Sequence, residues 1–169
     1  KDYVAIKIVR NIDKYRHAAM IELEVLNTLE RNDQGGSRHC VALREWFDYR
    51  GHVCIVFEKL GLSLFDFLRK NEYRPFPIDL VQDFSRQLLE SVAYLHELHL
   101  VHTDLKPENI LLVSLDLARS ASVTSGRRPQ STRVVPASSA IKVIDFGSAT
   151  FEDQHHSSIV STRHYRAPE

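Results

Sequence analysis

Apolar and polar residues alternate at the beginning of the chain, which predicts a β-strand over residues 3–9. The apolar residues of one face are β-branched: Val4, Ile6 and Ile8. Lys7 lies on the opposite face, which is otherwise apolar. A lysine in this position is either a surface side chain at the edge of a sheet or a charged side chain with a functional role.

The spacing of the apolar residues then changes from every second position to every third or fourth position, which predicts a helix over residues 13–31. Its apolar stripe consists of Ala18, Ile21, Val25 and Leu29. Glu22 follows Ile21 on this stripe and is expected to point inward, whereas Glu24 points elsewhere.

A loop over residues 32–38 (Asn-Asp-Gln-Gly-Gly-Ser-Arg) follows the helix. Two apolar stretches, 46–49 and 53–57, are then joined by Arg-Gly-His, which predicts a β-hairpin. We expect Trp46 to pack in the core.

Two helices are predicted next. The first covers residues 63–70 with Ser63 as its cap. The second opens with a capping box that begins at Asp79. Its apolar stripe indicates a buried scaffold helix and consists of Val81, Phe84, Leu88, Val92 and Leu95.

The pattern breaks between residues 114 and 140, a segment rich in Ser, Thr, Arg and Pro that predicts loop or disorder. It separates two apolar runs, 110–113 and 141–144, that would otherwise form a hairpin. An insert at a hairpin tip costs little loop-closure entropy. We favour an unstructured spacer, and a phosphorylation target is the alternative.

The overall composition narrows the class of protein. Of 169 residues, 43% are apolar, which is enough for a core, and 22 acidic residues balance 22 basic ones. This balance argues against a general nucleic-acid-binding surface and against an acidic disordered chain. No apolar run is long enough to span a membrane. Cys40 and Cys54 lack metal-ligand spacing and are predicted to be packed thiols of an intracellular protein.

The candidate catalytic residues are concentrated in residues 102–109, His-Thr-Asp-Leu-Lys-Pro-Glu-Asn, which lie between two short apolar runs. A carboxylate at Asp104, an ammonium at Lys106 and an amide at Asn109 are the groups that phosphoryl transfer requires. The alternative is an ordinary solvated turn. A zinc site at His96, His99 and His102 is disfavoured, because His-Glu-Leu-His does not match the zinc pattern.

Four short motifs resemble the protein kinase family in their order. Val-Ala-Ile-Lys at 4–7 precedes the loop at 102–109, and Asp-Phe-Gly at 145–147 and Ala-Pro-Glu at 167–169 follow it. The resemblance implies an α+β, two-lobed kinase fold that is incomplete, with part of the N-lobe sheet, the family's helix C and the first part of the helical C-lobe. We expect a fragment or a partial gene product, since the family's Gly-rich loop and later helices are missing.

The implied partial kinase domain covers residues 1–169. Its parts would be an N-lobe portion at 1–57, a hinge at 58–62 and a C-lobe portion at 63–169, with the insert at 114–140.

The resemblance implies an ATP site. Lys7 would pair with the α- and β-phosphates, and Glu22 would hold Lys7 in place. Phe57 would be the gatekeeper beside the adenine. The backbone of Glu58 and of Leu60 would hydrogen-bond the adenine.

The resemblance also implies the catalytic roles. Asp145 and Asn109 would bind Mg²⁺, and Asp104 would be the catalytic base. Lys106 would stabilise the γ-phosphoryl group during transfer. Thr162 would bond both Asp104 and Lys106, which favours Ser/Thr acceptors and leaves dual specificity open.

Thr103 departs from the family pattern, in which an Arg precedes the catalytic Asp and clamps a phosphorylated activation loop. Threonine cannot make that bidentate contact. We therefore expect catalytic competence not to depend on a phosphate held at this position.

His-Thr-Asp, the long insert and residues 159–169 together resemble the LAMMER, or CDC2-like (CLK), kinases. That group implies a nuclear, and alternatively also cytoplasmic, monomer that phosphorylates Ser/Arg-rich splicing factors. No direct nucleic-acid or membrane partner is implied. The competing interpretation is a truncated, catalytically inactive kinase-like fragment that acts at most as a binding module. A nucleic-acid-binding module is a more distant alternative.

Overall fold

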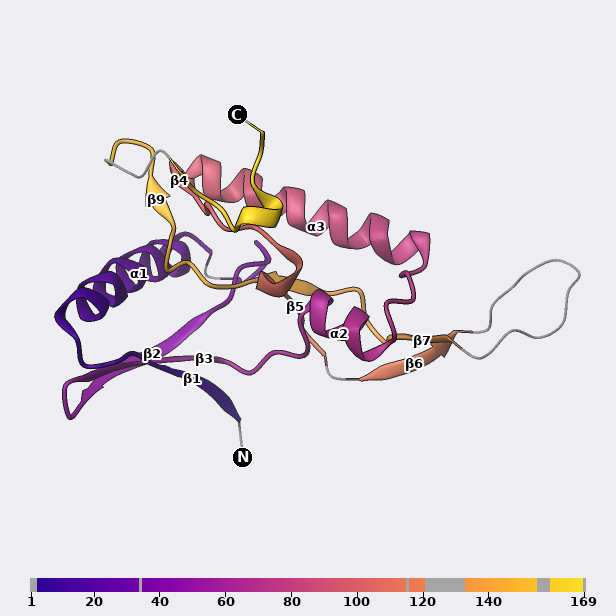
Figure 1. Ribbon diagram of the computed structural model, residues 1–169, viewed down its shortest axis with the longest axis horizontal. Coiled ribbons are helices and arrows are strands. Elements are labelled where there is room, and N and C mark those ends of the chain that lie inside the picture. The colour runs from indigo at the N-terminus through magenta and orange to yellow at the C-terminus, as the bar shows by residue number, and fades with distance from the viewer. Residues whose placement is uncertain (1–2, 34, 115, 121–132, 155–158, 169) are drawn as a thin grey trace, which may run out of the picture.

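The computed structural model describes residues 3–33, 35–114, 116–120, 133–154 and 159–168. A small antiparallel sheet and one helix come first, and a mainly helical part with short strand pairs follows (Figure 1). This arrangement confirms the predicted α+β class.

The sheet contains three antiparallel strands in the order β1-β3-β2. Their bounds are Val4–Ile8 for β1, Leu43–Tyr49 for β2 and His52–Glu58 for β3. The predicted hairpin is thus confirmed, with Arg50 and Gly51 at positive φ in its turn. Trp46 was predicted to be core but is 43% exposed. It lies on an edge strand, so no neighbouring strand in the sheet covers its outer side.

Helix α1, Asp13–Asn32, packs on the sheet, but its buried face is rotated from the predicted stripe. Ile21 is 37% exposed and Ala18 is also exposed. The buried face consists of Ala19, Glu22, Leu23, Val25, Leu26 and Leu29. These residues also repeat every three or four positions, so periodicity alone could not separate the two stripes.

Helix α2, Leu64–Lys70, is capped as predicted, because the Ser63 hydroxyl accepts a hydrogen bond from the Asp66 amide at 2.9 Å. Helix α3, Ile78–Glu97, begins before the predicted cap at Asp79. Its N-cap is Pro77, and no side chain caps it. None of the helices in the described ranges is both long and apolar enough to cross a membrane.

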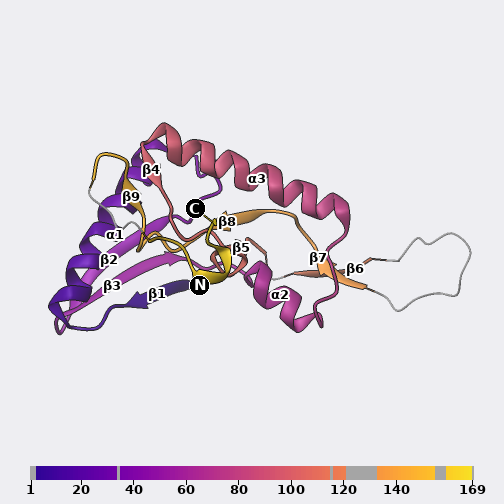
Figure 2. The same ribbon diagram turned by 45° about the horizontal axis from the view of Figure 1, so that its top comes forward.

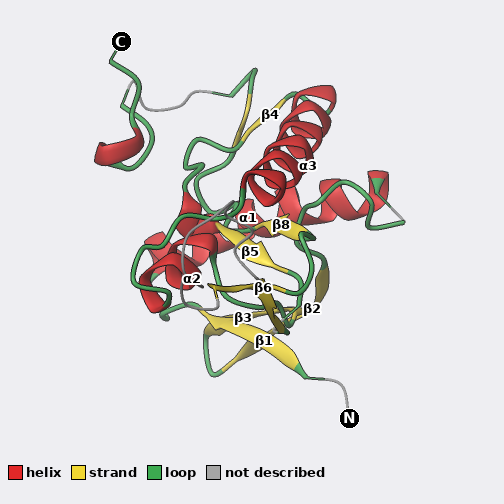
Figure 3. Ribbon diagram, turned by 90° about the vertical axis from the view of Figure 1, so that its right-hand side faces the viewer, coloured by secondary structure: helices red, strands yellow, loops and turns green. Residues whose placement is uncertain are grey.

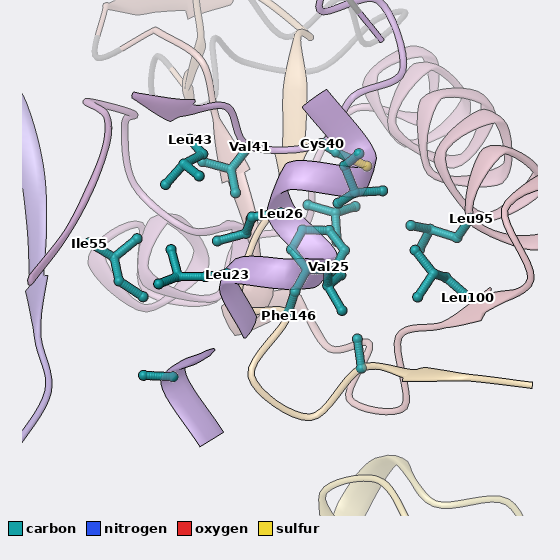
Figure 4. Close-up of a cluster of buried hydrophobic side chains, with 14 of the residues drawn as sticks. Leu23, Val25, Leu26, Cys40, Val41, Leu43, Ile55, Leu95, Leu100 and Phe146 are labelled. Atoms are coloured by element: carbon teal, nitrogen blue, oxygen red, sulfur yellow. The ribbon is translucent and has the colours of Figure 1, made fainter. Parts of the chain in front are cut away.

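The main core joins α1, the sheet and α3 around Phe146, which is only 1% exposed (Figure 4). Cys40 and Cys54 are both free and buried, as predicted. Burial raises the pKa of the Cys40 thiol to about 11, so this thiol is protonated at neutral pH. Because both side chains are buried and free, we interpret both thiols as packing groups.

Strands β5, Ile110–Leu112, and β8, Ile141–Val143, form the predicted antiparallel pair. This pair lies between α3 and the three-stranded sheet (Figures 2 and 3). The segment that follows α1 is bonded to β8, with the Val41 amide donating to the Val143 carbonyl at 2.9 Å. The carboxyl end of β8 is thereby fixed against both parts of the molecule.

The prediction of loop or disorder over 114–140 is wrong at both ends of this segment. Strand β6, Leu117–Ser120, pairs with β7, Arg133–Pro136, in a ribbon that projects past α2 (Figure 1). Val135 is buried, and the Asn71 side chain donates to the Val134 carbonyl at 3.3 Å. Serine-rich composition concealed these short apolar stretches. The interpretations of the insert as a spacer or a phosphorylation target mainly concern residues 121–132, which lie outside the described residues.

Candidate active site

Lys7 on β1 and Glu22 on α1 form an ion pair across the gap between strand and helix. Lys7 Nζ lies 2.7 and 2.8 Å from the two Glu22 carboxylate oxygens. Burial alone would lower the pKa of Lys7, but the charge and hydrogen bonds of Glu22, with help from Asp145, outweigh this effect and raise it. The lysine is therefore a fixed cation at neutral pH.

Asp145 follows β8 and brings a second carboxylate to the same lysine, with 3.3 Å between Lys7 Nζ and Asp145 Oδ1. Its φ of 64° lies in the left-handed region, which Asp tolerates better than most residues. Phe146 anchors this turn in the core. A Cβ added at Gly147 would lie 3.4 Å from carboxylate oxygens of Asp145 and Glu22, which is ordinary van der Waals contact, so Gly147 lies directly beside both carboxylates.

A cavity of about 410 Å³ opens beside this triad. Its lining includes the three residues predicted to surround an adenine, Phe57, Glu58 and Leu60. It also includes Lys7, Glu22, Asn109 and Asp145. The predicted cofactor-binding residues therefore surround one space, while their individual contacts with a nucleotide stay predictions.

The side chain of Glu58 has a structural role that sequence reasoning missed. Its Oε1 accepts from the Ala42 amide at 2.8 Å and from Lys142 Nζ at 2.5 Å. Glu58 and Lys142 are 84 positions apart, so no local pattern signalled the pair. The carboxylate ties the end of β3 to β8 beside the cavity.

Asp104 receives hydrogen bonds on both carboxylate oxygens. Oδ1 accepts from the Thr162 amide at 3.0 Å and from its hydroxyl at 2.6 Å, and Oδ2 accepts from Lys106 Nζ at 2.5 Å. Burial would raise the pKa of Asp104, but these bonds from Lys106 and Thr162 lower it overall. Asp104 is therefore an ionised, oriented acceptor.

Lys106 completes this cluster. Its ammonium also donates to the Thr162 hydroxyl at 2.9 Å, and the hydrogen bond to Asp104 raises its pKa. The structure thus brings together the three residues predicted to be catalytic. A fixed carboxylate beside a fixed cation can accept a proton from a hydroxyl and offset developing negative charge.

Asn109 and Asp145 are the predicted metal ligands. The Asn109 carbonyl accepts from the Ile144 amide at 2.9 Å, which brings the two ligands close in the fold. Its side-chain amide donates to the Asp104 carbonyl at 3.0 Å, and this leaves Oδ1 for coordination. In the described part of the chain, no three His, Cys, Asp or Glu residues cluster for a metal. Two protein oxygens fit Mg²⁺, which takes few protein ligands and completes its shell with phosphates and water.

His102 forms a hydrogen bond with the backbone of Asp104, the predicted base. Its ring is buried, with Nε2 donating to the Ile144 carbonyl at 3.0 Å and Nδ1 accepting from the Asp104 amide at 3.2 Å. Its ring centroid lies 5.1 Å from that of Phe146. Both hydrogen bonds require the neutral ring protonated at Nε2.

Burial lowers the pKa of His102, so protons bind more readily to the unfolded chain, in which histidine has a pKa of about 6.5. His102 therefore contributes stability at neutral pH that is lost as the pH falls through its unfolded value. We expect the free energy of unfolding to decline less from pH 7 to pH 5 in His102→Gln than in the wild type. Urea denaturation at both pH values measures this, and equal declines would contradict it.

Comparison with known proteins adds three findings. The protein kinase domain model matches residues 1–169. The chain is 64% identical to Serine/threonine-protein kinase AFC1 of Arabidopsis thaliana, with all of this chain and 37% of AFC1 covered. It is 50% identical to Dual specificity protein kinase CLK2 of Homo sapiens, with 98% of this chain and 32% of CLK2 covered. The chain thus spans about a third of these relatives.

A solved kinase domain superimposes with a TM-score of 0.87 at 40% identity. The match covers 99% of this chain and 50% of that one. The chain therefore has the architecture of about half of that solved protein.

Proposed function

The chain belongs to the protein kinase family, in its LAMMER or CDC2-like group, and from this premise we propose that it transfers the γ-phosphoryl group of ATP to protein hydroxyl groups. One observation carries the proposal. Asp104, Lys106 and Thr162 form a hydrogen-bonded cluster, which Asn109 connects to the cavity that Lys7 and Asp145 line.

In the proposed mechanism, each residue does one task. Lys7, held by Glu22, binds the α- and β-phosphates of ATP in the cavity. Asp104 orients the acceptor hydroxyl and takes its proton at a carboxylate oxygen. Lys106 offsets charge on the group in transfer. Mg²⁺ held by Asp145 and Asn109 would neutralise charge on the phosphates.

The proposed acceptors are Ser and Thr hydroxyls, with Tyr as an additional acceptor. Relatives named serine/threonine-protein kinase and relatives named dual specificity protein kinase together support this breadth. We extend the proposal to Ser/Arg-rich splicing factors as substrates and to a nuclear monomer, on the motif resemblance described above.

The direct test is phosphoryl transfer by the complete natural protein that contains this chain. We expect Mg²⁺-dependent incorporation of phosphate from labelled ATP into a peptide of Ser/Arg repeats. A matched peptide with Arg replaced by Ala should be phosphorylated at least about tenfold less efficiently. Equal use of both peptides would contradict the substrate class. No transfer to any protein substrate would contradict the proposed kinase activity and favour a catalytically inactive binding module.

A further inference from the structure

Thr103, immediately before the proposed base, has a strained backbone. Its φ is 67°, in the left-handed region that β-branched residues rarely occupy. Such a conformation persists where the surrounding contacts over-determine it, and it is concentrated at functional sites. The contacts that hold Thr103 in this conformation therefore indicate its role.

Two neutral hydrogen bonds hold it. The Thr103 hydroxyl donates to the Ser148 carbonyl at 2.8 Å, and the Thr103 carbonyl accepts from the Ser161 hydroxyl at 2.7 Å. Ser148 follows Asp-Phe-Gly, and Ser161 lies shortly before Ala-Pro-Glu. One residue of the catalytic loop thus binds both ends of the segment between these motifs.

The Ser161 bond bears directly on Asp104. Ser161 precedes Thr162, whose amide and hydroxyl both donate to Asp104 Oδ1. Ser161 also has a φ of 67°, and Arg166 holds it by donating to its carbonyl at 2.9 Å. If Ser161 moved away from Thr103, Thr162 would move away from Asp104 with it.

The space around these bonds suits neutral groups. A hollow of about 420 Å³ lies between the two segments, and its described lining contains no cationic residue. Five of these residues bear hydroxyls, and the only charge among them is Asp104: Thr103, Asp104, Ser148, Thr150, Ile159, Val160, Ser161 and Thr162. A phosphate in this hollow would lie near a carboxylate without a cation from these residues.

We propose that Thr103 and Ser161 are positioning residues whose hydroxyl–carbonyl bonds align Thr162 with Asp104 in the absence of a phosphate. The inference rests on the proposed kinase function and specifies how the site is held in its working form. The hydroxyls replace, with uncharged bonds, the clamp that Arg and a phosphate provide elsewhere.

The experiment uses the complete natural protein after phosphatase treatment, with intact mass confirming that no phosphate remains. We expect the treated wild type to retain at least about half of its kcat. Thr103→Val keeps the shape but loses the hydroxyl, and we expect its kcat to fall about tenfold with KM for ATP within about twofold. Ser161→Ala should behave in the same way.

Two controls separate positioning from general damage. Thr103→Ser keeps a hydroxyl at this position, and its kcat should stay near the wild-type value. Thr150→Val changes another hydroxyl in the same hollow, one that donates to the adjacent Phe151 carbonyl at 3.2 Å, and should leave kcat unchanged. Loss of wild-type activity on dephosphorylation, or an unchanged kcat in Thr103→Val, would overturn the inference. An equal loss of kcat in Thr150→Val would overturn it as well.

Hydrogen exchange tests the same bonds without catalysis. The Thr162 amide should exchange faster in Thr103→Val and Ser161→Ala than in the wild type or Thr150→Val, because its bond to Asp104 opens more often. Unchanged exchange in the first two variants would overturn the inference. If no variant or wild type transfers phosphate while this exchange pattern holds, the proposed function fails and the positioning role stands.

Discussion

Asp104→Asn is expected to lower kcat by about a thousandfold, while the dissociation constant for ATP stays within about twofold of the wild-type value. The amide matches the carboxylate in size but cannot accept a proton from the substrate hydroxyl. The ATP site itself is lined by other residues, Lys7 and Asp145 among them. Steady-state kinetics give kcat, and calorimetry gives the affinity for ATP.

Asp153→Asn is the matched control, since Asp153 is an exposed acid in a turn outside the cavity lining. Its kcat should equal that of the wild type. If Asp104→Asn lowered kcat and ATP affinity by the same factor, Asp104 would be a nucleotide-binding residue and the assigned role of base would be wrong.

Local patterns predicted the elements that carry the proposed site. Alternation placed Lys7 on the second, mostly apolar face of a strand, and Glu22 was expected to point inward from the following helix. The two side chains meet at 2.7 Å. Pairing of the apolar runs around the insert was also predictable, because each run is long enough to form a short strand. The roles of the residues in the four motifs came instead from the resemblance to the kinase family, before their distances were known.

Local patterns could not predict features that depend on distant partners, and the bond of Thr162 to Asp104 was expected only from the family resemblance. The predicted buried face of α1 was wrong at Ile21, which is exposed. Two faces of the helix have similar periodicity, and packing against the rest of the molecule selects one of them. Trp46 is exposed because its strand is at a sheet edge, which strand order decides. The bonds from Glu58 to Lys142 and from Ser161 to Thr103 span 84 and 58 positions. No local signal accompanies such contacts.

Asp145→Asn is expected to abolish the effect of Mg²⁺ on ATP binding and to lower kcat by about a thousandfold. Asn is preferred to Ala because position 145 has a φ of 64°, which Asn adopts with little strain. The variant therefore changes the charge of the ligand and keeps the backbone. In the wild type, Mg²⁺ should strengthen ATP binding, because an ion held by this carboxylate would offset the negative charge of the phosphates.

Calorimetry with ATP in Mg²⁺ and in EDTA separates the two contributions. The variant should bind ATP equally in both buffers, with an affinity close to that of the wild type in EDTA, because the remaining lining of the cavity is unchanged. Asp79→Asn, an exposed acid in the first turn of α3, should keep the full effect of Mg²⁺. If Asp145→Asn also kept it, the metal would be held without this carboxylate, and the pairing of Asp145 with Lys7 at 3.3 Å would be its main role.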